Sequence, residues 1–221
     1  MRQTDWEYLG PLLWQALVDT AYMVATSLAI ALVVGTALGV GLYVTRRRGL
    51  LANRVLNAVE NGVINLVRPI PFVIFVTAVA PLTIALTGSR IGRDAAILPM
   101  AIMASVAFAR LVEQTLVGLD PGVVEAARAM GASRWRIVWS VLIPETLGPL
   151  ILAFTFLVIA VIDMSAIVGI VGAGGLGDFA IRHGYQRFNW EVALVTVALI
   201  IVLVQVVQLL GNVLARKALR R

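Results

Sequence analysis

Five stretches of the chain are nearly free of charged residues and are long enough, or almost long enough, to cross a membrane. A hydrocarbon layer about 30 Å thick takes about 20 helical residues to cross. The predicted transmembrane helices cover residues 20–45, 62–86, 95–117, 147–168 and 192–214. This pattern predicts an all-α membrane protein with five transmembrane helices in a single domain, residues 1–221.

The first predicted helix has small residues at regular intervals. Ser27, Ala31, Gly35 and Gly39 recur every four residues, which places them on one face of a helix. Small side chains let another backbone approach closely. We interpret this face as a surface for helix packing rather than as a substrate path.

The second segment begins as an amphipathic helix that we expect along the inner membrane interface. Its polar face comprises Asn57, Glu60 or Asn61, Asn65 and Arg68. Pro69 and Pro71 follow directly. Because proline removes a backbone donor and disfavours helical geometry in the preceding residue, a kink or break is expected there, either as a simple bend or as a hinge.

Composition agrees with a membrane protein and limits the possible chemistry. Hydrophobic residues make up 60% of the chain and charged residues 14%, which is too apolar for a soluble domain. The chain has no cysteine and one histidine, His183. A disulfide framework, a cysteine metal site and a histidine cluster are therefore excluded. The sequence G-x-x-x-x-G-K-[ST] is also absent, so no ATP site is expected.

The basic residues predict the orientation of the chain, whose formal net charge is +6. Eleven lie in connections on one side: Arg46, Arg47, Arg48, Arg54, Arg128, Arg134, Arg136, Arg216, Lys217, Arg220 and Arg221. Five lie on the other: Arg2, Arg90, Arg93, Arg182 and Arg187. Since basic connections stay in the cytoplasm, we expect the N-terminus outside and the C-terminus inside. The orientation of the chain then explains its net positive charge, and we expect no nucleic-acid partner.

Residues 120–145 form a cytoplasmic connection that is too polar to cross the membrane and too regular for a slack loop. Asp120 can cap a helix that starts at Pro121. Gly131 can end this helix in a left-handed conformation, and Ser133 can cap the next helix. The segment therefore predicts a helical hairpin. Both ends of the segment are joined to predicted membrane helices, which leaves little core to orient a DNA-recognition helix. We therefore do not expect the hairpin to bind DNA.

The second helix of this hairpin has an apolar stripe and is expected to end at Pro144. The stripe comprises Trp135, Val138, Trp139 and Leu142. Their spacing places them on one helical face. Such a face suits a membrane surface or the groove of a partner protein.

Asp163 is the most unusual residue of the predicted spans. It follows a run of 17 uncharged residues. An ionisable group is costly in lipid, so it normally faces the protein interior or a water-filled path. Its role is either in a substrate pathway or in a structural hydrogen bond.

The segment Gly172–Gly177, GAGGLG, fits the pattern G-x-G-x-x-G. A dinucleotide site would need a preceding strand, whereas a predicted membrane helix precedes this segment. We instead expect a tight re-entrant or external turn packed against helix ends.

Within the hairpin, Glu125-Ala126-Ala127, Gly131 and Ile143-Pro144 resemble the EAA loop of ABC importer permeases. In that family the loop docks into a cleft of a separate ATPase subunit. The resemblance therefore implies that these six residues couple the chain to an ATPase.

Further segments extend the resemblance to methionine-type ABC importer permeases over most of the chain: Leu42–Gly49, Arg68–Phe72, Ala109–Glu113, Glu125–Ser133, Val171–Asp178 and Ile181–Phe188. It implies a homodimer in the bacterial inner membrane, with two cytoplasmic ATPase subunits and an extracytoplasmic binding protein. ATP and Mg would bind the ATPase, so this chain needs no cofactor and is not an enzyme. The expected cargo is D- or L-methionine or a closely related compound, and the alternative is another amino acid or a small peptide.

One segment departs from that family. Where a run similar to Gly-Tyr-Ser-Ala-Met is expected, the chain has Asp163-Met164-Ser165-Ala166-Ile167. The first three of these residues are the candidate substrate pathway, and the departure extends the possible cargo to cationic or larger molecules. Two rival functions are a scaffold that anchors an ATPase and a membrane enzyme using Asp163, His183 and Glu191. No nucleophile–base or metal-ligand spacing accompanies the latter three residues.

Overall fold

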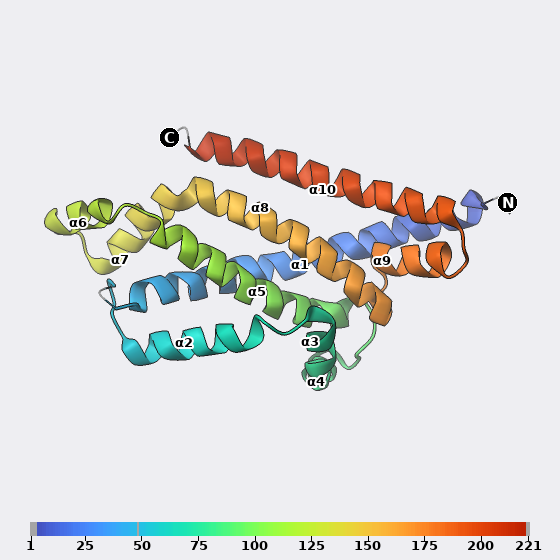
Figure 1. Cartoon of the computed structure of the whole chain (residues 1–221), viewed down its shortest axis with the longest axis horizontal. Helices are drawn as coiled ribbons and strands as arrows, with labels where there is room; N and C mark the ends of the chain where they lie inside the picture. Colours follow the sequence, from blue (N-terminus) through green and yellow to red (C-terminus); the bar gives the residue numbers. More distant parts are fainter. Residues whose placement is uncertain (1–3, 48, 220–221) are drawn as a thin grey trace. The chain divides into compact units, whose positions relative to one another are not determined.

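A computed structural model describes residues 4–47 and 49–219. Every regular element in these residues is a helix (Figure 1), so the all-α prediction is confirmed. In chain order they are α1 (Trp6–Thr45), α2 (Arg54–Val67), α3 (Phe72–Ala78), α4 (Ala80–Thr87), α5 (Arg93–Val117), α6 (Pro121–Ala129), α7 (Arg134–Ile137), η1 (Val138–Leu142), α8 (Ile143–Val168), η2 (Gly169–Ala173), α9 (Gly175–Phe179), η3 (Ala180–Tyr185) and α10 (Trp190–Leu219). The elements labelled η are π-helical.

Four helices in the described residues are long and apolar enough to cross a membrane. They are α1, α5, the helical stretch Arg134–Ala173 that contains α8 and ends in a kink at Gly172, and α10. Helices α2 and α3 meet the same criterion only when they are taken together as one broken span. The chain is therefore a multi-pass membrane protein with four or five candidate spans.

The second segment differs from the single helix expected over residues 62–86. Helix α2 ends at Val67, and α3 begins at Phe72. The expected break at the prolines is confirmed, because Pro71 has the extended conformation φ −57°, ψ 132°. Its carbonyl accepts hydrogen bonds from Ile74 and Phe75, which start the next helix.

Helix α1 starts at Trp6, well before the expected residue 20. The Asp5 carboxylate caps its first turn by accepting a hydrogen bond from the Tyr8 N–H at 3.1 Å. The early turns also pack into a buried apolar cluster with α9 and α10: Leu9, Ala16, Leu176, Phe179 and Val192. Glu7 and Asp19 therefore interrupt the uncharged run without interrupting the helix.

The chain forms two compact units, which are described separately. Unit 1 takes in the described residues of Met1–Ile30, Ile70–Ala104 and Val158–Val207, and unit 2 those of Ala31–Pro69, Ser105–Leu157 and Gln208–Arg221. The chain passes between the units five times: within α1, between α2 and α3, and within α5, α8 and α10.

Close packing of α1 on α5 in unit 2 depends on two glycines. A Cβ atom on Gly35 would lie 2.9 Å from both the Phe108 Cβ and the Ser105 carbonyl oxygen. One on Gly39 would lie 2.5 Å from the Ala109 carbonyl oxygen. The interpretation of this face as a packing surface is therefore confirmed at both glycines.

The packing predicts that Gly39→Ala destabilises the protein by about 1–3 kcal/mol, because the added methyl group overpacks the α1–α5 contact. Gly10→Ala is the matched control, since a Cβ there has nothing within 4 Å. Alanine also favours the helix at that position by about 0.5–1 kcal/mol. Thermal unfolding of the detergent-purified variants measures both effects. An unchanged or raised Tm for Gly39→Ala would contradict the prediction.

Candidate functional site

The hairpin predicted in residues 120–145 is present in unit 2, and α6 is its first helix (Figure 1). The Asp120 carboxylate accepts a hydrogen bond from the Gly122 N–H at 2.8 Å, and Pro121 takes the first helical position. Both features of the predicted N-terminal cap are confirmed.

The turn of the hairpin is closed by backbone hydrogen bonds around Gly131. This residue has φ +79°. Its N–H donates to the Arg128 carbonyl, and the Ala132 N–H donates to the Ala127 carbonyl. The two bonds together form a Schellman motif, which requires the left-handed conformation that glycine tolerates. Ser133 then caps α7 by accepting from the Arg136 N–H at 3.3 Å.

The second helix of the hairpin does not end at Pro144. Helices α7, η1 and α8 form one continuous helix from Arg134. In the π-helical turn before the proline, the Ile143 N–H donates to the Val138 carbonyl five residues earlier. We attribute the continuity to this wider turn, which makes room for a residue without a donor. The hairpin is thus joined directly to the long apolar helix α8.

The hairpin exposes some of the predicted coupling residues and buries others. Glu125, Ala126, Gly131 and Pro144 are exposed, Ile143 is half-buried and Ala127 is buried. The predicted apolar stripe is divided in the same way. Val138 and Leu142 are buried, whereas Trp135 is 62% and Trp139 66% exposed. Two tryptophans therefore remain available for a partner.

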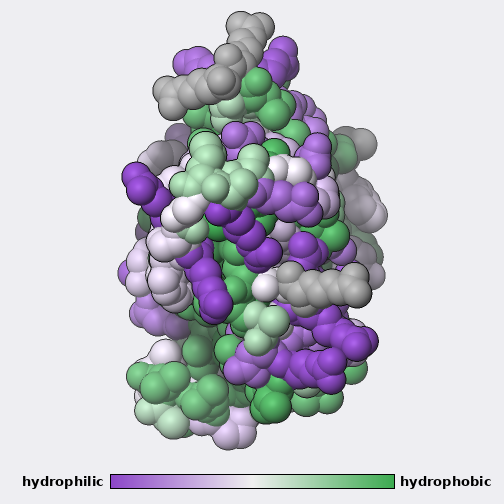
Figure 2. Space-filling view, turned by 90° about the vertical axis from the view of Figure 1, so that its left-hand side faces the viewer, coloured by the Kyte–Doolittle hydropathy of each residue, from purple (hydrophilic) through white to green (hydrophobic). Residues whose placement is uncertain are grey.

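Basic residues are concentrated in unit 2, and two of them, Arg134 and Arg136, flank Trp135 in the sequence. Eight of the eleven that predict the cytoplasmic side lie in the described residues of this unit, and Arg48, Arg220 and Arg221 lie outside the described residues. Of the five basic residues predicted on the other side of the membrane, four lie in unit 1, and Arg2 lies outside the described residues. Figure 2 shows hydrophilic residues over much of the face that includes the hairpin, interrupted by hydrophobic ones.

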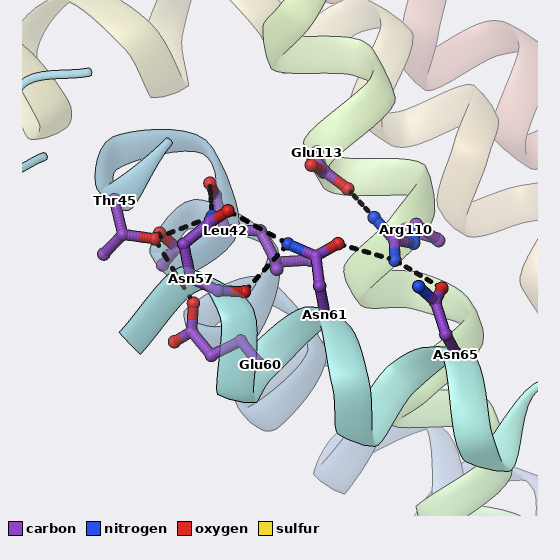
Figure 3. Close-up of polar contacts among 9 residues, drawn as sticks. Leu42, Thr45, Asn57, Glu60, Asn61, Asn65, Arg110 and Glu113 are labelled. Atoms are coloured by element: carbon purple, nitrogen blue, oxygen red, sulfur yellow. Dashed lines mark hydrogen bonds and ion pairs between the residues drawn. The ribbon is translucent and has the colours of Figure 1, made fainter. Parts of the chain in front are cut away.

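A polar network in unit 2 joins α2 to α5, the helix that leads into the hairpin (Figure 3). The Arg110 guanidinium on α5 donates to the Asn61 side-chain oxygen at 2.9 Å and to that of Asn65 at 2.8 Å. It also pairs with Glu113 one turn along α5. The polar face of α2 therefore faces a charged group of the protein.

The network continues from α2 to the end of α1. The Asn61 amide donates to the Asn57 carbonyl, and the Asn57 amide donates to the Leu42 carbonyl and the Thr45 hydroxyl, both at 3.0 Å. The Thr45 hydroxyl in turn donates to Glu60 at 3.4 Å. Sequence reasoning found the polar face of α2 but not its partner Arg110. The only available signal was a charge within an otherwise apolar segment.

The three candidate pathway residues lie in the unit 1 part of α8. Asp163 is exposed, Met164 is half-buried and Ser165 is buried. Asp163 and Ser165 line a cavity of about 230 Å³, and Met164 does not. The Ser165 hydroxyl donates to the Ile162 carbonyl at 2.6 Å. Within residues 4–47 and 49–219, Asp163 has no hydrogen bond or ion pair, so no structural partner of its carboxylate is present there.

The GAGGLG segment forms the expected turn. Gly172, Gly174 and Gly175 all have positive φ values, between 81° and 98°. The turn brings α9 back onto α8, where a Cβ on Gly177 would lie 2.5 Å from the Ala166 Cα. A helix precedes the segment instead of a strand, so it lacks the context of a dinucleotide site.

Glu191 has hydrogen-bond partners other than Asp163, whereas the buried Nδ1 of His183 has none in the described residues. Glu191 accepts hydrogen bonds from Thr4 and from the Trp6 indole. The His183 ring lies against Phe179, and burial, with a smaller effect from Arg187, lowers the pKa of His183. No hydrogen bond or ion pair joins any two of Asp163, His183 and Glu191 in the described residues.

A helical multi-pass membrane protein with an exposed hairpin between two apolar helices is the class that these features define. The family model for the inner membrane component of binding-protein-dependent transport systems matches residues 35–220. The chain belongs to this family.

Similar proteins extend over nearly the whole chain. A probable D-methionine transport system permease protein MetI of Vibrio cholerae is 41% identical over 206 residues, which are 93% of this chain and 92% of the relative. The methionine import system permease protein MetP of Bacillus subtilis is 39% identical and covers 91% of each chain. A chain of the MetNI methionine ABC transporter in an inward-facing conformation superposes with a TM-score of 0.91, at 36% identity and 99% coverage of both chains.

The hairpin turn predicts that Gly131→Ala destabilises the protein by about 1–2 kcal/mol, the cost of a left-handed conformation for a residue with a Cβ. Gly62→Ala is the matched control. A Cβ at either position has nothing within 4 Å, but only Gly131 has a positive φ. Thermal unfolding of the two purified variants measures the difference. Equal Tm values would show that the turn conformation is not responsible.

The network predicts that Arg110→Met destabilises the protein by about 2 kcal/mol, because Glu113 loses its ion-pair partner while partly buried. Arg128→Met removes an arginine from an exposed position on α6, where the expected change is within about 0.5 kcal/mol. Denaturation of both variants in the same detergent provides the comparison. Equal stability of the two would contradict a stabilising role for the Arg110 contacts.

Proposed function

We propose that this chain is the permease subunit of an ATP-driven bacterial importer for methionine, in the D or L form, or for a closely related compound. The observation that carries the proposal is the similarity to methionine permeases along nearly the full length of both chains. The similarity to a MetNI chain over 99% of both chains supports the same function. Another amino acid or a small peptide is the alternative cargo.

The proposed topology has five transmembrane helices in the bacterial inner membrane, with the N-terminus outside and the C-terminus in the cytoplasm. The four long apolar helices, together with α2 and α3 taken as one broken span, support five spans. The concentration of basic residues in unit 2 supports a cytoplasmic position for the hairpin and the C-terminal end.

The hairpin is the proposed contact with a separate ATPase subunit. Glu125, Ala126, Ala127, Gly131, Ile143 and Pro144 form its coupling region. Because its second helix continues into α8, a displacement of the hairpin is transmitted through an unbroken helix. A rigid element joined to a span suits the switching of access from one side of the membrane to the other.

In this proposal the permease forms a homodimer with two ATPase subunits and receives its cargo from an extracytoplasmic binding protein. ATP and Mg bind the ATPase subunits, and the permease itself catalyses no reaction. Its helices provide the passage and alternate between two arrangements of different accessibility. Lipid surrounds its apolar helices.

Reconstitution with the cognate ATPase and binding protein tests this function. We expect ATP-dependent methionine uptake, and we expect Trp135→Ala/Trp139→Ala to reduce ATPase capture and uptake by about tenfold or more, as for buried tryptophan anchors of interfaces. Trp14→Ala is the matched control, because Trp14 and Trp139 are both 66% exposed.

Two results would contradict separate parts of the proposal. Absence of methionine uptake by the assembled wild-type complex would contradict the cargo. Full ATPase capture by the double tryptophan variant would contradict docking through the hairpin, whatever the cargo is.

A further inference from the structure

We propose that Asp163 is a specificity residue whose carboxylate binds the ammonium group of the transported molecule. The ligand class is a primary amine with an apolar side chain. This inference rests on the proposed transport function, since it assigns a substrate-selecting contact to the passage of that importer.

The first observation is the unsatisfied charge of Asp163. The residue lies on α8 after 17 uncharged residues and is exposed on the chain. No hydrogen bond or ion pair to it occurs within residues 4–47 and 49–219. A carboxylate at this position is costly against lipid, so it must face water, a ligand or another protein surface.

The second observation is the cavity beside Asp163, which has a volume of about 230 Å³ and lies within unit 1. Its walls come from α1, α8, α9 and α10. Most of its lining is apolar and includes Ile159, Ile162, Leu176, Ile200 and Val204. A ligand that fills it therefore needs an apolar part beside the group that meets the carboxylate.

The third observation is that the hydroxyl groups lining the cavity already have partners. The Thr20 hydroxyl accepts a hydrogen bond from the Leu176 N–H at 2.8 Å. The Ser165 hydroxyl donates to the Ile162 carbonyl at 2.6 Å. Asp163 is thus the free polar side chain in the lining, and its charge favours a cationic group.

The chemistry of the lining narrows the class of cation. No lysine or arginine lines the cavity, so a ligand carboxylate would find no basic side chain there. The described residues also contain no group of three side chains able to hold a metal ion. An organic ammonium group joined to an apolar chain fits both facts.

Two related probes test the proposal by equilibrium binding to the permease–ATPase complex without the binding protein. Methioninamide keeps the ammonium group and lacks the carboxylate, and N-acetylmethionine lacks the ammonium group. We expect the wild type to bind methioninamide at least tenfold more tightly. Asp163→Asn should abolish this preference, and Asp163→Glu, which keeps the charge, should retain it.

Asp94→Asn is the matched control, because Asp94 is an exposed carboxylate in unit 1 that does not line the cavity. It should keep the wild-type preference. Equal binding of the two probes by the wild type, no saturable binding of either, or a preference that survives Asp163→Asn would each overturn the proposal.

Methionine uptake by the wild type, measured in parallel, separates this inference from the proposed function. Normal uptake without an amine preference overturns only the role of Asp163. No uptake together with a preference that depends on Asp163 overturns the methionine cargo and supports the amine site.

Discussion

Polar groups inside a membrane must find their partners within the protein, and this constraint explains most of the structure. Helices satisfy their own backbone groups, which is why the described chain is built of long helices without strands. Where the chain departs from regular helix, a particular substitute for the lost hydrogen bonds is present. The Pro71 carbonyl accepts hydrogen bonds from the first turn of α3. Before Pro144, the Ile143 N–H donates to the Val138 carbonyl, five residues earlier in the chain.

The same constraint explains the unusual orientation of α2. Its apolar side chains, including Val55, Val59 and Val63, are exposed, whereas its asparagines contact Arg110 or α1. A helix of a soluble protein has the reverse arrangement. An apolar outer face and a polar inner face suit surroundings of lipid, where the charge of Arg110 has to be neutralised by side chains of the protein.

Local features could be predicted from the sequence where neighbouring residues decide the conformation. The hairpin is the clearest case, because Asp120, Gly131 and Ser133 form their decisive hydrogen bonds within a few residues. The break at Pro69 and Pro71 follows from the residues themselves in the same way. The apolar segments also predicted most of the long helices, because a helix that crosses lipid must be apolar whatever its tertiary contacts are.

Features that depend on distant residues could not be predicted. The early turns of α1 pack against apolar residues of α9 and α10, which are more than 150 positions away. The partners of Arg110 are 45 and 49 positions away on α2. Pro144 shows a different limit, because a proline usually stops a helix but a π-helical turn before it allows the helix to continue.

Arg110 and Asp163 are both charged residues within apolar segments, but the structure gives them different surroundings. The sequence singles out Asp163, which follows a long uncharged run and would be costly in lipid, whereas it predicts no role for Arg110. Arg110 has three side-chain partners and is largely buried. Asp163 is exposed beside an apolar cavity and, in the described chain, has no partner. The Arg110 guanidinium, which is paired within the protein, stabilises the contact between α2 and α5. The Asp163 carboxylate is unpaired in the described chain, and we therefore propose that it binds the ammonium group of the cargo.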